Sequence, residues 1–97
     1  MLKEITSEEL IKPSKFQLID IREPYEHEEG HIKNSINIPM GDFLEELNQL
    51  DKTKQIIVYC NTGRRSKPVA YMVYKLHNIT LYNLKGGYKN FLKTPAK

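Results

Sequence analysis

The chain alternates short, β-branched apolar runs with stretches of helical spacing, and this alternation restricts the fold more than any other feature of the sequence. Phe16–Ile21 and Ile56–Tyr59 are short runs rich in isoleucine or valine with polar flanks, which predicts two buried strands. Further strands are predicted at Ser35–Ile38, at Thr80–Leu84 and around Ile5. Strands that alternate with helices favour a parallel sheet with helices on both faces, so we expect an α/β fold.

Three of the intervening stretches have the residue spacing of helices, and a fourth, shorter helix is expected near the end of the chain. Glu8–Lys12 follows a threonine and a serine, either of which can serve as its N-cap. Ser66–His77 is predicted to be helical with its first residue as N-cap, and the last helix is predicted to run from Gly86-Gly87 to about Phe91. Asp42–Leu50 has apolar residues three and four apart, so it is expected to pack on the core through Phe43, Leu44, Leu47 and Leu50.

Length and composition are typical of one small globular domain. The 97 residues, of which 39% are hydrophobic and 28% charged, predict a single domain over residues 1–97. A chain this short buries a limited core, to which Tyr59 and Tyr71 are expected to contribute. No apolar run approaches the roughly 20 residues that a membrane helix requires, so no membrane partner is expected. The only cysteine cannot form an internal disulfide and the N-terminus lacks a signal-peptide layout, which together predict a cytoplasmic protein.

Charge is distributed unevenly along the sequence. Residues 1–51 contain all twelve acids and five bases, a net charge of −7, whereas residues 52–97 contain ten lysines and arginines and no acid, a net charge of +10. The bases of the second half are spaced along the chain rather than clustered, so no nucleic-acid partner is predicted. A group in this half that handles an anion lies in a favourable field.

The single cysteine, Cys60, directly follows the predicted strand Ile56–Tyr59 and precedes the predicted helix Ser66–His77. In parallel sheets, loops at the carboxyl ends of strands form the binding sites. Gly63 allows the amides of this loop to point inward, and the helix N-terminus and two adjacent arginines add positive charge. Such surroundings lower the pKa of a thiol and favour the thiolate, which is the nucleophile. Cys60 is therefore the candidate catalytic residue, the alternative being an inert buried cysteine.

Two chemistries use a cysteine in an anion-binding loop between a strand and a helix. One is phosphate-ester or arsenate chemistry with the pattern C-x-x-x-x-x-R, in which the arginine clamps a tetrahedral anion with two hydrogen bonds. Here the sixth residue after Cys60 is Ser66, and the arginine falls one position early, at Arg65. The loop is therefore one residue too short for phosphatase or arsenate reductase chemistry. The second chemistry is therefore expected, in which the loop holds a smaller group, such as a sulfur atom carried on the cysteine.

Three segments carry a family resemblance that covers nearly the whole chain. The first begins with D-I-R-E-P-Y-E at residues 20–26 and continues with G-H-I at 30–32, I-N at 36–37 and I-P at 38–39. The second is C-N-T-G-R-R-S at residues 60–66, and the third is L-K-G-G at residues 84–87. Taken together they resemble the single-domain rhodaneses, which are sulfurtransferases. Ser35 replaces the family's usual alanine, and Phe91 stands where many members have tryptophan. Neither position touches the predicted chemistry.

The resemblance implies a five-stranded parallel sheet flanked by helices and a persulfide intermediate on Cys60. The expected activity is transfer of a sulfane sulfur from a small anionic donor, such as thiosulfate, to a thiol or cyanide acceptor, with no cofactor and no metal. Of the two arginines in the loop, the family pattern favours Arg65 as the one that points inward. The residues expected to bind substrate and persulfide are Asn61, Thr62, Gly63, Arg64, Arg65 and Ser66.

An alternative function belongs to a different class. In this alternative the domain is a persulfide carrier or a redox-sensitive protein-interaction module, which passes sulfur only to a docked protein. Such a module would turn over small acceptors poorly, and the uneven charge of the chain would provide its docking face.

Asp20 and Arg22 are expected to support the site rather than to react. They alternate at the end of a predicted strand, so their side chains are expected on opposite sides of the sheet. Asp20 ends a buried run and must find hydrogen-bond donors there. Arg22 is expected to form a local ion pair with Glu23 or Glu26.

The residues from His27 to His31 match H-E-x-x-H, a zinc-binding motif of helices. We expect no zinc site, because Gly30 weakens a helix between the two histidines. A catalytic zinc also needs a third protein ligand, and the sequence after His31 has one further histidine, His77, and no acid beyond Asp51. His31 is instead expected to mark a turn.

Overall fold

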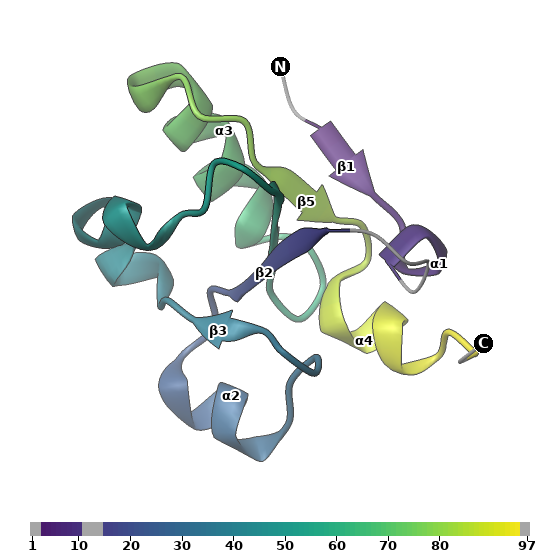
Figure 1. The fold of residues 1–97 in the computed structure, drawn as a ribbon. Helices are drawn as coiled ribbons and strands as arrows, with labels where there is room; N and C mark the ends of the chain where they lie inside the picture. Colours follow the sequence, from purple (N-terminus) through teal and green to yellow (C-terminus); the bar gives the residue numbers. More distant parts are fainter. Residues whose placement is uncertain (1–2, 11–14, 96–97) are drawn as a thin grey trace.

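The computed structural model describes residues 3–10 and 15–95, and its strands form one parallel sheet (Figure 1). The strand order across the sheet is β1-β5-β4-β2-β3, and every neighbouring pair is parallel. The expected five-stranded parallel sheet is thus confirmed, and each predicted strand agrees to within two residues at either end. The strands are β1 (Lys3–Ile5), β2 (Phe16–Asp20), β3 (Ile36–Asn37), β4 (Gln55–Tyr59) and β5 (Tyr82–Leu84).

In the described part of the chain, five helical segments connect or follow these strands: α1 (Ser7–Leu10), α2 (Pro24–Glu29), the 3-10 helix η1 (Met40–Gln49), α3 (Ser66–His77) and α4 (Gly87–Leu92). Thr6 provides the N-cap of α1, because its hydroxyl accepts a hydrogen bond from the amide of Glu9 at 3.2 Å. The predicted residues of this helix after Leu10 lie outside the described residues. The bounds predicted for α3 are confirmed.

The helix α2 is not among the predicted helices, although the sequence contains signals for it. Pro24 stands in its first turn, where the missing amide hydrogen costs nothing. The amide of Glu23 donates to the carboxylate of Glu26 at 2.9 Å, which is half of a capping box. The helix ends at Glu29, directly before Gly30.

The two faces of the sheet carry separate apolar cores, because successive side chains of a strand point to opposite faces. On one face, Ile56 and Val58 of β4 pack with residues of α3 and η1. On the other face, Ile57 and Tyr59 pack with residues of α1 and α4. Helices therefore cover both faces of the sheet, as expected (Figure 1).

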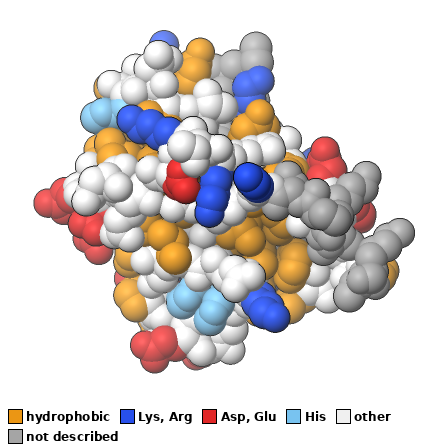
Figure 2. All heavy atoms as spheres, viewed as in Figure 1, with side chains coloured by type: hydrophobic (Ala, Val, Ile, Leu, Met, Phe, Trp, Pro, Cys, Tyr) orange, Lys and Arg blue, Asp and Glu red, His pale blue; other side chains and the backbone are white. Residues whose placement is uncertain are grey.

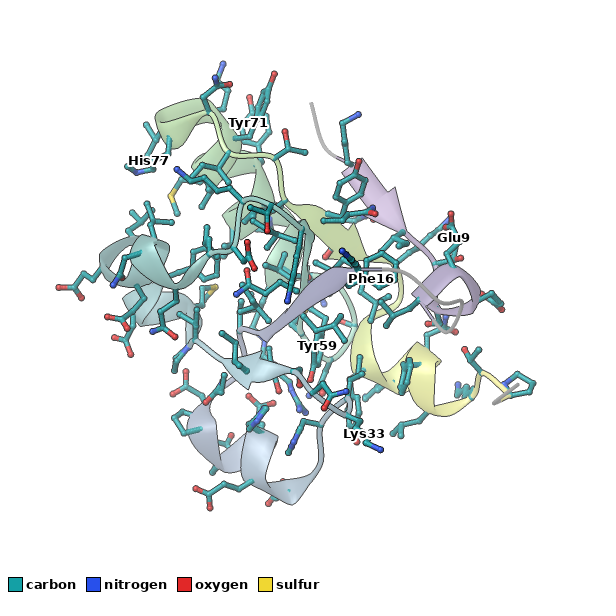
Figure 3. The ribbon with its side chains drawn as sticks, viewed as in Figure 1. Glu9, Phe16, Lys33, Tyr59, Tyr71 and His77 are labelled. Carbon is teal, nitrogen blue, oxygen red and sulfur yellow. The ribbon has the colours of Figure 1, made fainter. Side chains whose placement is uncertain are left out.

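Two predicted core contributions are wrong. Leu44 of η1 is 43% exposed, whereas Phe43 and Leu50 are buried and Leu47 is partly buried. The backbone leaves helical geometry at Glu46, so the apolar residues before and after that position do not form one continuous stripe. Figure 3 shows Tyr71 projecting from α3 away from the sheet, while Tyr59 lies in the interior.

We expect Phe43→Ala to lower the free energy of unfolding by about 3–5 kcal/mol, because it empties a fully buried aromatic site. The matched change next to it, Leu44→Ala, should cost less than about 1 kcal/mol, because that side chain is largely in solvent. Urea denaturation of the two variants measures both values. Equal losses would contradict the placement of η1 on the sheet.

Candidate active site

Three segments of the chain meet where neighbouring strands end. β4 lies between β2 and β5 in the sheet, so the residues that follow these three strands lie side by side. The amide of Ile21, just after β2, donates to the carbonyl of Tyr59 at 3.0 Å. The loop that starts at Cys60 follows β4, and Gly86-Gly87 follow β5. This edge of a parallel sheet is where binding sites form.

The loop of residues 60–65 encloses the sulfur of Cys60. The cysteine is fully buried, and its Sγ accepts hydrogen bonds from the amides of Gly63 at 3.1 Å and Arg65 at 3.3 Å. Gly63 has a φ of +91°, a conformation that favours glycine. The expectation that loop amides turn inward is confirmed at these two positions.

The surroundings of Cys60 favour its thiolate. Burial by itself raises the pKa of the thiol, but hydrogen bonds from the Ser66 hydroxyl and from amides of the loop outweigh it, so the pKa lies below its usual value. The hydroxyl oxygen of Ser66 is 3.5 Å from Sγ. The prediction that Ser66 caps α3 is wrong, because Arg65 occupies the N-cap position and the Ser66 side chain turns inward.

The start of α4 holds the backbone of the loop. The amide of Tyr88 donates to the carbonyl of Cys60 at 2.8 Å, and that of Lys89 donates to the carbonyl of Asn61 at 3.0 Å. Gly87 has a φ of +65°, and a Cβ atom there would lie 2.5 Å from the carbonyl group of Asn61. Only glycine fits this contact, so the double glycine sets how closely α4 approaches the loop.

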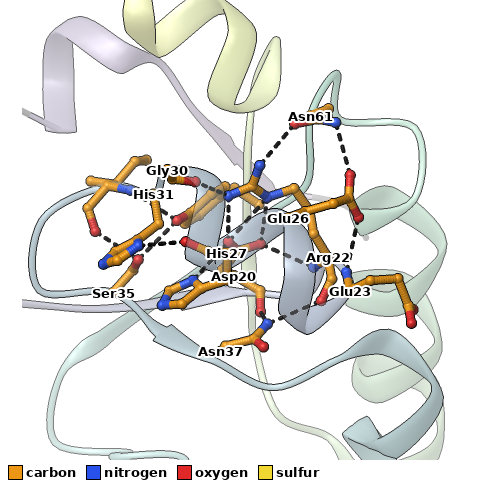
Figure 4. A network of polar contacts seen from close by, with 12 residues as sticks. Asp20, Arg22, Glu23, Glu26, His27, Gly30, His31, Ser35, Asn37 and Asn61 are labelled. Carbon is orange, nitrogen blue, oxygen red and sulfur yellow. Dashed lines mark hydrogen bonds and ion pairs between the residues drawn. The ribbon is translucent and has the colours of Figure 1, made fainter.

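Asp20 and Arg22 form a buried ion pair at the end of β2 (Figure 4). The guanidinium Nη2 lies 2.7 Å from the Asp20 carboxylate, which also accepts from Nε and contacts His27 Nδ1 at 2.9 Å. Burial raises the pKa of Asp20, but the hydrogen bonds from Arg22 and His27 outweigh this effect. The pKa of Asp20 therefore lies below its ordinary value. The expectation that these side chains point to opposite sides is wrong, because residues two apart in an extended segment share a face, and Asp20 and Arg22 meet there.

A chain of polar contacts leads from this pair to the cysteine loop (Figure 4). Arg22 donates through Nη1 to the side-chain oxygen of Asn61 at 3.1 Å, and Asn61 donates to Glu26 at 3.0 Å. Glu26 in turn forms two hydrogen bonds with the guanidinium of Arg65, both 3.1 Å long. The ion pair expected between Arg22 and Glu23 or Glu26 is therefore wrong, because Arg22 pairs with Asp20. The contribution of Glu26 was not foreseen from the sequence.

The remaining loop side chains face outward or are engaged elsewhere. Thr62 and Arg64 are exposed. The family pattern favours Arg65 as the inward-pointing arginine, but Glu26 binds its guanidinium, and the amide of Arg65 is the group that faces the sulfur. Figure 2 shows lysines and arginines dispersed over the face in view rather than gathered in one patch.

The two histidines of the H-E-x-x-H pattern do not share a helix. α2 ends before Gly30, and the rings of His27 and His31 stack with their centroids 3.7 Å apart. Within residues 3–10 and 15–95, no group of three or more metal-binding side chains is placed to hold an ion. In the same described part of the chain, none of the helices is long and apolar enough to cross a membrane.

Comparison with known proteins places the chain in a family. The family model described as the Rhodanese-like domain matches residues 6–94. The uncharacterised protein YqhL of Bacillus subtilis is 38% identical over 92 residues, which cover 94% of this chain and 73% of that protein. A tRNA uridine(34) hydroxylase of Hamiltonella defensa is 34% identical over 92% of this chain, but the chain spans only 27% of that hydroxylase.

Solved structures agree with these matches. A rhodanese-related protein of Thermoplasma volcanium has a TM-score of 0.85 at 28% identity, covering 98% of this chain and 95% of that one. A rhodanese-like domain protein of Staphylococcus aureus has a TM-score of 0.82 at 29% identity, covering 93% of this chain and 91% of that one. The chain therefore belongs to the rhodanese-like domain family, a family of the sulfurtransferase type.

Proposed function

We propose that the protein transfers a sulfane sulfur from a small anionic donor such as thiosulfate, through a persulfide on Cys60, to a thiol or cyanide acceptor. The observation that carries this proposal is the enclosed sulfur of Cys60, which accepts two amide hydrogen bonds from its loop. Membership of the rhodanese-like domain family supports the same chemistry. A reducing, cytoplasmic setting would keep the nucleophile available.

The reaction needs two displacements at sulfur. The Cys60 thiolate attacks the outer sulfur of thiosulfate, a new S–S bond forms, and the bond to the sulfite group breaks so that sulfite leaves with the electron pair. The nucleophilic acceptor then attacks the outer sulfur of the persulfide, and the cysteine departs as thiolate. No redox cofactor and no metal take part, and the chemistry is covalent, ping-pong catalysis.

Each part of the site has a role in this scheme. The amides of Gly63 and Arg65 would stabilise negative charge on the cysteine sulfur or on the persulfide. The exposed Arg64 would attract the anionic donor. Asp20 and Arg22 would act as supports, because Arg22 reaches the loop through Asn61. The other members of the proposed binding loop are Asn61, Thr62 and Ser66.

A second candidate function is a persulfide carrier or redox-sensitive interaction module that serves only a docked protein. The observation that favours it is the complete burial of Cys60, because a docked protein that opens the loop would reach this sulfur more readily than a small acceptor would. Several relatives are tRNA uridine(34) hydroxylases, and this chain corresponds to less than a third of the first two of them. That share of sequence supports a common domain, and we do not extend the hydroxylase activity to this chain.

We expect one sulfur atom to be added to the protein on incubation with thiosulfate, as measured by intact-protein mass spectrometry. Addition of cyanide should then remove the sulfur and release thiocyanate, and Cys60→Ser should take up none. Uptake that persists in Cys60→Ser would refute the site. Uptake with negligible thiocyanate turnover would favour the carrier, and phosphate-ester hydrolysis without uptake would refute both functions.

Gly87→Ala is expected to slow sulfur loading roughly ten- to hundredfold, because the added Cβ forces the backbone of the cysteine loop out of position. Gly41→Ala is the matched control, since a Cβ there meets no atom within 4 Å, and it should load within about twofold of the parent protein. The rate of mass increase with thiosulfate measures both. Similar rates in the two variants would show that the contact of α4 with the loop does not position the nucleophile.

A further inference from the structure

A fully buried asparagine, Asn83, links the cysteine loop to the edge of the sheet. It lies in β5, with Glu4 of β1 and Val58 of β4 as its neighbours in register. A buried amide is costly unless it is hydrogen-bonded. Its Nδ2 donates to the carboxylate of Glu4 at 3.0 Å, and its Oδ1 accepts a hydrogen bond from the hydroxyl of Ser66. Ser66 is also the side chain next to the sulfur of Cys60.

The direction of this chain of hydrogen bonds is determined at its outer end. A carboxylate only accepts, so the NH₂ group of Asn83 must face Glu4 and its oxygen must face Ser66. Lys67 Nζ lies 3.7 Å from the same carboxylate, so Glu4 accepts from a cation as well as from Asn83. Because the amide oxygen also only accepts, the single hydroxyl hydrogen of Ser66 points to Asn83. In this arrangement Ser66 presents its lone pairs to Cys60 Sγ. It donates to the sulfur, and so lowers the pKa of Cys60, only when its hydroxyl hydrogen turns away from Asn83.

We propose that Asn83, oriented by Glu4, is a positioning residue that competes with the sulfur of Cys60 for the hydroxyl hydrogen of Ser66. A protonated thiol can donate to the Ser66 oxygen, and every polar group from Cys60 to Glu4 then has a hydrogen-bond partner. A thiolate or persulfide needs the hydrogen of Ser66 instead, and gains it only when Ser66 releases Asn83. The pair Glu4–Asn83 thus limits how strongly the loop favours the charged sulfur. This inference rests on the proposed role of Cys60 as the reacting group.

Other charged groups lie near the two ends of this series of hydrogen bonds. They act on the sulfur through space, and their effect on the pKa of Cys60 must be separated from that of the Asn83 orientation. Arg65 lies on the loop side and interacts electrostatically with Cys60. Glu4 and Lys67 lie at the far end, and Glu4 is itself partly exposed. Neutralising Glu4 therefore changes the field at the sulfur as well as the orientation of Asn83. A test has to distinguish the two routes.

The test is Glu4→Gln, alone and combined with Ser66→Ala. Glutamine can accept as well as donate, so the Asn83 amide is free to turn its NH₂ group to Ser66 and release the hydroxyl hydrogen for the sulfur. We expect the pKa of Cys60, measured from the pH dependence of its alkylation rate, to fall by about 0.5 to 1 unit, the value of one redirected hydrogen bond. In the Ser66→Ala background the same change should leave that pKa unaltered.

Two outcomes would overturn the inference. One is an unchanged pKa in Glu4→Gln, and the other is an equal fall with and without Ser66, which would show an effect through space. Asn83→Leu, which removes the competing acceptor, should also lower the pKa, provided that its circular dichroism matches that of the parent. Sulfur uptake from thiosulfate by the parent protein is measured separately. If no sulfur is taken up, the proposed function is refuted, and the pKa values of Cys60 in the variants still test the role of Asn83.

Discussion

A negatively charged sulfur inside a protein is unfavourable unless hydrogen-bond donors surround it, and the site depends on this constraint. Cys60 is fully buried, so burial alone would hold its thiol in the protonated form. Hydrogen bonds from the Ser66 hydroxyl and from the loop amides reverse this preference, and the amides of Gly63 and Arg65 both point at Sγ. They can do so because the loop adopts a tight path with a positive φ at Gly63. The local backbone, rather than any one charged side chain, thus makes Cys60 a suitable nucleophile.

The path of the loop is maintained from both neighbouring strands. After β5, the first amides of α4 bond to the carbonyls of Cys60 and Asn61. After β2, the buried Asp20–Arg22 pair reaches Asn61, and Glu26 reaches Arg65. The uneven charge of the sequence is partly neutralised by such contacts between the two halves of the chain. Acids of the first half pair with bases of the second in Glu26–Arg65 and Glu4–Lys67, and both pairs lie near the site.

The sequence allows the sheet to be predicted because its β-branched runs are short and clearly bounded. The cysteine loop could be predicted because Cys60, Gly63 and the arginines lie between a strand and a helix. Contacts that depend on where a backbone turns could not be predicted in this way. The contact of Arg22 with Asn61, 39 positions away in sequence, is one of these, whereas its pairing with Asp20 follows the rule that residues two apart in an extended segment share a face. The inward turn of Ser66 likewise depends on Asn83, which is distant in sequence and carries no motif.

The central claim is that the loop lowers the pKa of Cys60 and so favours its thiolate. The most direct measurement is the rate of alkylation of the unmodified protein by iodoacetamide across a pH series, since the chain has a single cysteine and no other thiol contributes. The geometry predicts a half-maximal rate at a pH below the value of about 8.5 for an unperturbed thiol. A midpoint at or above that value would contradict the claim, because the loop amides would then fail to offset the burial of the sulfur.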